Sequence, residues 1–162
     1  MIVKTYNVLI LDTTNSATSI MAEALFNTMG NGVYKAYSAG FLPAVVANRF
    51  ALEEIKSTTY PISKLKTKNW DEYAQPNAPL MNFIITVCDT AAKQSMPTWP
   101  GKPMFLHWSF KDPLLIEGSF EEKKAAFKTT FEMLQQKIEL FTELPLAHLN
   151  QKILNARIAE WS

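Results

Sequence analysis

Cysteine and histidine are scarce in this chain. Its 162 residues include one cysteine, Cys88, and two histidines, His107 and His148. A single cysteine cannot form a disulfide within the chain, and it excludes a metal site built from several thiolates. Because the two histidines are far apart in the sequence, we also expect no structural zinc site. We expect neither a metal nor a cofactor.

An excess of charge and a long apolar run are also missing. Sixteen lysines and arginines balance 15 acidic residues, which leaves a formal charge of +1 and no bulk attraction for nucleic acid or an anionic membrane. No apolar stretch approaches the roughly 20 residues that cross a bilayer. The first residues, MIVKTYN, do not have the layout of a signal peptide. We therefore expect a cytoplasmic protein with no nucleic-acid or membrane partner, while the oligomeric state stays open.

The composition suits a globular protein with a substantial core. Hydrophobic residues make up 48% of the chain and aromatic residues 12%, which predicts one domain over residues 1–162. Segments typical of strands and helices alternate, which predicts an α/β fold with a mostly parallel central sheet. The expected strands are 6–11, 33–39, 82–88 and 104–108, and the expected helices are 19–29, 44–57, 70–73, 119–144 and 146–161.

The stretch VLILDTTNSATSIMAEALFNTMG, residues 8–30, contains the candidate functional site. An apolar run is followed by a polar loop, residues 12–18, and then by a pattern with helical spacing. The start of a helix carries unpaired N–H groups and the positive end of the helix dipole, so a loop folded onto it can bind an anion. The candidate anion-binding residues are Thr13, Thr14, Asn15, Ser16, Ala17 and Ser19.

This stretch resembles the active-site loop of the low-molecular-weight tyrosine phosphatases, in particular their arsenate reductase branch. That loop reads Cys-Thr-Gly-Asn-Ser-x-Arg-Ser before Met-Ala-Glu, and the segments Tyr-Ser-Ala-Gly, ITVCD, Trp-Pro-Gly, His-Trp and Asp-Pro follow here in the family's order. The resemblance extends from about residue 8 to about residue 157 and implies the family's three-layer fold. The loop and helix residues that match are Thr13, Asn15, Ser16, Ser19, Met21, Ala22 and Glu23.

The residues that carry the family's chemistry are different. Asp12 stands where the family has its nucleophilic cysteine, Thr18 where it has its oxyanion-binding arginine, and Thr14 where it has a loop glycine. In the family, a thiolate attacks phosphate or arsenate while the guanidinium binds the equatorial oxygens. A carboxylate instead repels the anion, by about 4 kcal/mol for two unit charges ~4 Å apart at an effective dielectric constant of 20. We therefore expect a catalytically inactive protein with a binding or regulatory role, toward an unknown protein partner or a small anion.

Asp12 has three possible roles. We favour a structural one, in which its carboxylate accepts hydrogen bonds from amides of residues 14–19 and takes the place of the anion. An enzyme of the family's phosphatase or arsenate reductase class stays possible. So does an aspartate-based phosphohydrolase, because Leu11-Asp12-Thr13-Thr14 also resembles the first motif of haloacid-dehalogenase-like phosphatases, which use Mg²⁺. Those enzymes need a second acid where Thr14 stands. Because a loop glycine often marks a backbone conformation that is costly for β-branched residues, we also expect strain at Thr14.

Two further positions have a family role and a plainer one. Asp112 matches the family's general acid, or it is a turn acid before Pro113. Cys88 matches a redox cysteine that needs two cysteine partners, but Asp12 and Met96 stand in those places, so we favour a small core residue.

A group of polar residues matches a cation site of the family. Asn15, Glu23 and Ser38 stand at positions that hold a monovalent cation in some arsenate reductases. We favour hydrogen-bond support of the loop as their role here.

Overall fold

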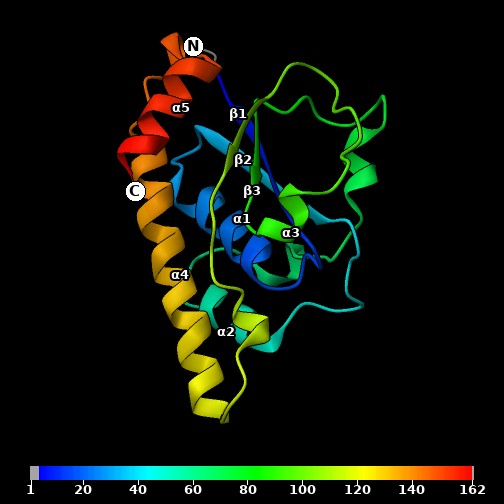
Figure 1. Ribbon diagram of the computed structural model, residues 1–162, viewed down its shortest axis with the longest axis vertical. Helices are drawn as coiled ribbons and strands as arrows, with labels where there is room; N and C mark the ends of the chain where they lie inside the picture. Colours follow the sequence, from blue (N-terminus) through cyan, green and yellow to red (C-terminus); the bar gives the residue numbers. More distant parts are fainter. Residues whose placement is uncertain (1–3, 162) are drawn as a thin grey trace.

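Four parallel strands form the centre of the computed structural model, which describes residues 4–161 (Figure 1). They are β1 (Tyr6–Asp12), β2 (Tyr34–Gly40), β3 (Phe83–Thr86) and β4 (Met104–His107), in the spatial order β2-β1-β3-β4. In register, Val8 of β1 lies opposite Ala36 of β2 and Phe83 of β3. The central strands β1 and β3 are the most continuous apolar runs, as expected for strands covered on both faces. The predicted α/β fold with a parallel sheet is confirmed.

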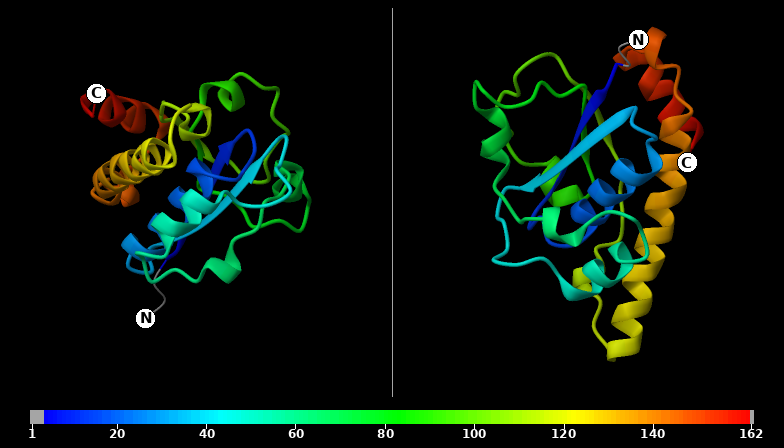
Figure 2. Two further views of the ribbon diagram at one scale, coloured as in Figure 1. Left: turned by 90° about the horizontal axis from the view of Figure 1, so that it is seen from below. Right: turned by 180° about the vertical axis from the view of Figure 1, so that it is seen from behind.

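Helices cover one face of the sheet and shorter elements cover the other (Figure 2). The core of the helical side contains Val8, Ile10 and Phe83, whereas Leu9, Leu11 and Ile84 point to the opposite side. This alternation follows from the two-residue period of a strand. The helices are α1 (Thr18–Met29), α2 (Arg49–Ile55), α3 (Asp89–Ala92), α4 (Phe120–Thr142) and α5 (Gln151–Glu160), with the 3₁₀ turns η1 (Ile62–Lys64), η2 (Trp70–Ala74), η3 (Pro113–Leu115) and η4 (Leu146–His148).

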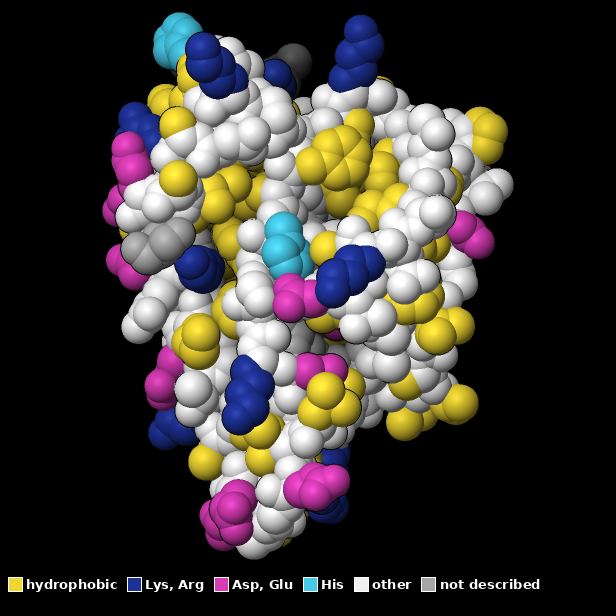
Figure 3. Space-filling view, viewed as in Figure 1, with side chains coloured by type: hydrophobic (Ala, Val, Ile, Leu, Met, Phe, Trp, Pro, Cys, Tyr) yellow, Lys and Arg dark blue, Asp and Glu magenta, His cyan; other side chains and the backbone are white. Residues whose placement is uncertain are grey.

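The surface shows no single-sign charge field on the face drawn in Figure 3, where basic and acidic side chains are interspersed around apolar hollows. This mixture agrees with the near-zero formal charge of +1. Within residues 4–161, no helix combines the length and apolarity that crossing a bilayer requires.

Two predicted helices begin later than their periodicity suggests. The segment before α2 is not helical, because its backbone bonds to the loop after β1: the amide of Ala44 donates to the Thr14 carbonyl at 2.9 Å. Asn48 then caps α2 by accepting the Phe50 amide at 2.8 Å. The last predicted helix divides into η4 and α5, and Asn150 caps α5. Tertiary hydrogen bonds and caps therefore override the helical spacing at both starts.

Side-chain amides protect both edges of the sheet. Asn27 of α1 accepts from the Ala36 amide of β2 at 2.9 Å and donates to the Ala36 carbonyl at 3.1 Å. Gln151 of α5 pairs with the amide and carbonyl of Phe105 in β4 in the same way, at 2.8 and 2.7 Å. Edge strands with free backbone groups can pair with other chains, and these two amides reduce that exposure.

Candidate functional site

Asp12 ends β1, and its carboxylate turns into the loop that leads to α1. One oxygen accepts a hydrogen bond from the Asn15 amide at 2.7 Å, and the other accepts one from the Ser19 amide at 3.1 Å. The residue is only 6% exposed. The predicted hydrogen bonds from amides of residues 14–19 are therefore confirmed.

The loop carbonyls point outward, toward the segment before α2. The carbonyls of Thr13, Thr14 and Ser16 accept hydrogen bonds at 2.8–2.9 Å from the amides of Leu42, Ala44 and Asn48. In a trans peptide, the N–H of the next residue points the opposite way from the carbonyl. The amides that follow these carbonyls are thus directed inward, which is the arrangement that an anion, or here the Asp12 carboxylate, requires.

The four positions that the family resemblance singles out lie together. Asp12, Thr18, Cys88 and Asp112 all line one cavity, although they are up to 100 residues apart in sequence. Its volume is about 10 Å³. That is close to the minimum that holds a single water molecule, so the cavity does not hold a tetrahedral oxyanion in this conformation.

Burial raises the pKa of Asp12 to about 6. Hydrogen bonds from Ser19 and Asn15 act in the opposite direction, and the nearby charge of Asp112 raises the pKa further. The cost of removing the carboxylate from water thus exceeds what its hydrogen bonds return to the charged form.

This pKa predicts how stability depends on pH. The pKa of Asp12 in the folded protein lies above its value of 3.8 in the unfolded chain, so protonation of this carboxyl stabilises the fold. The stabilisation is fully present below the unfolded pKa and is lost as the pH rises through about 6. We expect the free energy of unfolding of the parent, relative to Asp12→Asn, to increase by about 1 kcal/mol from about pH 7 to about pH 5. Urea denaturation of both proteins across this range measures the difference. A difference that does not change with pH would contradict the raised pKa.

The predicted strain at Thr14 is wrong, because the left-handed residue of the loop is Asn15, with φ of 51°. Thr14 is half-buried, and its hydroxyl lies 2.8 Å from the Ser16 hydroxyl. Asparagine tolerates the left-handed region better than most residues. The side-chain amide of Asn15 donates to the hydroxyls of Ser19 at 2.8 Å and Ser38 at 2.9 Å, and these bonds hold the backbone of Asn15 in place.

Gly40 lets the end of β2 lie against the loop. It is opposite Asp12 in the sheet register. A Cβ atom at this position would lie 2.5 Å from the Thr13 carbonyl oxygen. Only glycine allows this close approach without moving the backbone.

Glu23 lies behind the loop in a buried polar network. Its carboxylate accepts hydrogen bonds from the hydroxyls of Ser38 at 2.7 Å and Tyr60 at 3.0 Å, and the Lys68 ammonium lies 4.0 Å away. Burial raises the pKa of Glu23, while the charge of Lys68 opposes that shift. The amide of Lys68 also donates to the Asn15 side chain at 3.0 Å. The residues that match the family's cation positions are thus bonded to one another, with a lysine beside them.

Sequence reasoning missed Lys68 and Tyr60 as parts of this network. Lys68 belongs to the basic run KLKTK, which is typical of a solvated surface, and Tyr60 lies in no recognisable motif. No local pattern could have revealed that both residues reach the Glu23 carboxylate.

Cys88 is not the core residue that we favoured. It is half-buried, and its sulfur lies 3.3 Å from the Thr13 hydroxyl and 3.4 Å from the Ala91 amide, so it caps α3 and contacts the loop. Asp112 accepts from the Leu114 amide at 2.9 Å and thereby caps η3, as the turn interpretation predicts. It lines the site cavity as well.

A second polar cluster lies at the ends of β3 and β4 and consists of Thr86, Asp89 and His107. The Nδ1 atom of His107 lies 2.7 Å from the Thr86 hydroxyl, and its Nε2 atom lies 2.8 Å from the Asp89 carboxylate. An ionised carboxylate can only accept, so Nε2 donates the hydrogen bond to Asp89. The motifs ITVCD and His-Trp contain these residues, but the sequence alone did not show that they meet.

Comparisons with known proteins agree with this fold. The model of the low molecular weight phosphotyrosine protein phosphatase family matches residues 7–154. Arsenate reductases of Halalkalibacterium halodurans and Bacillus subtilis are each 32% identical over 133 residues, which is 82% of this chain and 92% of theirs. The crystal structure of an arsenate reductase from Archaeoglobus fulgidus has a TM-score of 0.57 and 25% identity, and covers 82% of this chain and 98% of that one. The chain therefore belongs to the low molecular weight phosphotyrosine protein phosphatase family, within its arsenate reductase branch.

Proposed function

We propose that this protein has lost the cysteine-based chemistry of its family and acts as a binding or regulatory module. The observation that carries the proposal is the pair of hydrogen bonds from the Asn15 and Ser19 amides to the Asp12 carboxylate. These bonds put a negative charge of the protein itself where the loop amides converge. An incoming oxyanion meets that charge as well as the small volume of the cavity.

The other cavity residues support the same proposal. Thr18 offers one hydroxyl where the family arginine offers five donors. Cys88 is the only cysteine, and it lies at the start of α3 rather than at the end of β1. A nucleophile must face the oxyanion donors, and those donors are bonded to Asp12.

The surface beside the loop supports a protein partner. Three exposed apolar side chains lie in the segment between β2 and α2, whose backbone bonds to the loop. They are Leu42, Val45 and Val46, which are 63%, 96% and 72% exposed. Neighbouring apolar side chains with this exposure are typical of interaction sites. A small anion stays the other candidate ligand, and the cytoplasmic location stays a prediction.

Enzyme assays test the loss of chemistry. We expect turnover of an aryl phosphate and thiol-coupled reduction of arsenate to equal a buffer blank, with and without Mg²⁺, because the loop has Asp12 and Thr18 where the family has its nucleophilic cysteine and its arginine. The arsenate reductase of Bacillus subtilis, assayed in parallel, shows that the conditions support activity. Turnover above the blank that disappears in Asp12→Ala would instead establish the aspartate-based enzyme.

A further inference from the structure

A polar pocket of about 610 Å³ lies along the outer edge of β2, away from the Asp12 cavity. Residues of α1, of β2 and of the segment 59–73 line it. β2 is an edge strand of the sheet, and the segment 59–73 runs on the same side of the sheet as β2 (Figure 2, right). The volume falls within the range of small-molecule sites, roughly 300–1,000 Å³.

Glu23 contributes a buried acceptor to this pocket. Its side chain is 6% exposed and lines the pocket from α1. An ionised carboxylate has about four acceptor positions. The hydroxyls of Ser38 and Tyr60 occupy two of them, and the Lys68 ammonium lies 4.0 Å from one of the two oxygens. The remaining positions can accept N–H groups of a ligand.

Three tyrosines add aromatic surface to the pocket. Tyr37 and Tyr73 lie with their ring centroids 5.5 Å apart, and Tyr60 bonds to Glu23. Burial raises the pKa of Tyr60 and of Tyr73, so both hydroxyls stay protonated at neutral pH. Aromatic rings of this kind bind planar groups by stacking or edge-on contact.

Three lysines give the pocket an excess of positive charge. Lys35 and Lys64 are exposed, and Lys68 is half-buried beside Glu23. The Lys35 ammonium lies 5.5 Å from the centre of the Tyr37 ring. Glu23 is the only acidic residue among those that line the pocket, so the positive charge prevails there.

We propose that this pocket binds a planar heterocycle that carries N–H donors and an anionic tail, which is the chemistry of a purine nucleotide. The ring contacts the tyrosines, its N–H groups donate to the Glu23 carboxylate, and its phosphate lies by Lys35 and Lys64. The proposed site is distinct from the Asp12 cavity, because no residue lines both.

Calorimetry with guanosine monophosphate, guanosine and inorganic phosphate tests each part of this ligand. We expect the nucleotide to bind at least about tenfold more tightly than guanosine or phosphate alone, with an affinity that falls as salt is added. Amide chemical shifts should change at Asn27 and Lys68 and stay constant at Phe105. Equal affinity for phosphate alone, or no binding of the nucleotide at millimolar concentration, would overturn the proposal.

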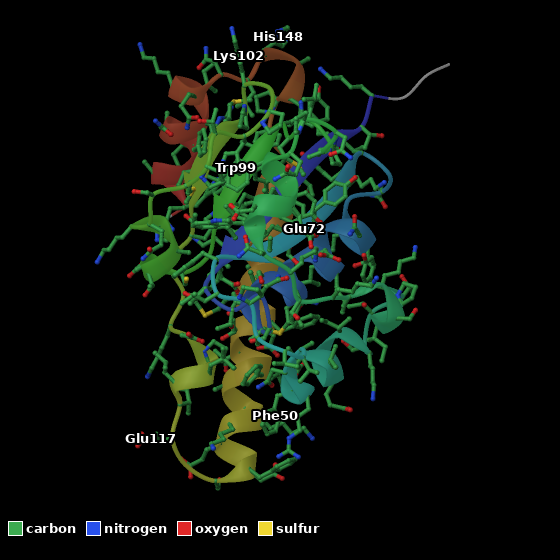
Figure 4. All side chains as sticks on the ribbon, turned by 90° about the vertical axis from the view of Figure 1, so that its right-hand side faces the viewer. Phe50, Glu72, Trp99, Lys102, Glu117 and His148 are labelled. Carbon is green, nitrogen blue, oxygen red and sulfur yellow. The ribbon has the colours of Figure 1, made fainter. Side chains whose placement is uncertain are left out.

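Two substitutions locate the site. Lys35→Met and Tyr73→Leu should each weaken nucleotide binding by about threefold to tenfold. Lys102→Met is the matched control, because Lys102 is exposed and does not line the pocket. In Figure 4 it lies near the top of the view, above Glu72, the neighbour of Tyr73. Denaturation midpoints show whether each variant is folded. If folded Lys35→Met and Tyr73→Leu bind as the parent does, the nucleotide lies elsewhere and the proposal fails.

Discussion

The double substitution Asp12→Cys with Thr18→Arg is expected to raise the affinity for inorganic phosphate by at least about a hundredfold. It removes the carboxylate that now accepts the Asn15 and Ser19 amides, so both donors become available to an anion. It also adds a guanidinium, which can bind two oxygens at once. Calorimetric titration of phosphate into the parent, the double variant and each single variant measures the gain.

Matched variants separate charge from geometry. Asp12→Cys with Thr18→Lys restores one positive charge without the planar fork, so its affinity should lie between those of the parent and the arginine variant. Adding Thr14→Gly should change little, because Thr14 does not hold the left-handed conformation of the loop. If neither the double nor the triple variant binds phosphate, the loop does not retain the family's shape. Weak phosphatase activity in the double variant would depend on Asp112, which lines the same cavity.

The substitution Phe141→Ala is expected to lower the free energy of unfolding by about 3–5 kcal/mol. Phe141 belongs to α4 and is fully buried. Its ring lies 4.9–6.1 Å, between centroids, from four other aromatic rings, which come from α1, β2, β3 and the segment after β4: Phe26, Tyr34, Phe83 and Trp108. Truncation would leave a cavity among rigid side chains that cannot close around it.

Phe120→Ala is the control for this substitution. Phe120 lies at the start of the same helix but is 51% exposed, so the same chemical change removes far less buried surface. Urea denaturation of both variants gives the comparison. Equal losses in the two variants would show that the aromatic cluster is not what attaches α4 to the sheet.

The elements with a strong periodicity were predictable because their pattern is local. β1 and β3 are continuous apolar runs, and the long helix α4 begins at a capping box formed by Ser119 and Glu122. The start of α2 was not predictable in the same way. Its periodic residues compete with hydrogen bonds from Ala44 and Asn48 to the loop, and these bonds exist only in the folded chain.

The site was predictable in its membership and less so in its geometry. The resemblance named Asp12, Thr18, Cys88 and Asp112, and the structure places all four around one cavity. The structure also shows that Asn15, not Thr14, has the left-handed backbone, and that Cys88 caps α3 instead of packing in the core. Both features depend on backbone angles and contacts that no sequence pattern encodes.

The sequence by itself determined the order of strands and helices, the strand–loop–helix that carries Asp12, and the absence of a cysteine and an arginine at the positions where the family has them. These properties follow from residue identity and short-range periodicity. Only the tertiary structure decided that the Asp12 carboxylate accepts the loop amides and that Lys68 and Tyr60 reach Glu23. It also decided that tyrosines and lysines line a pocket at the edge of β2. Such contacts join residues far apart in the chain, and their energies depend on burial, which exists only once the sheet and its helices have packed.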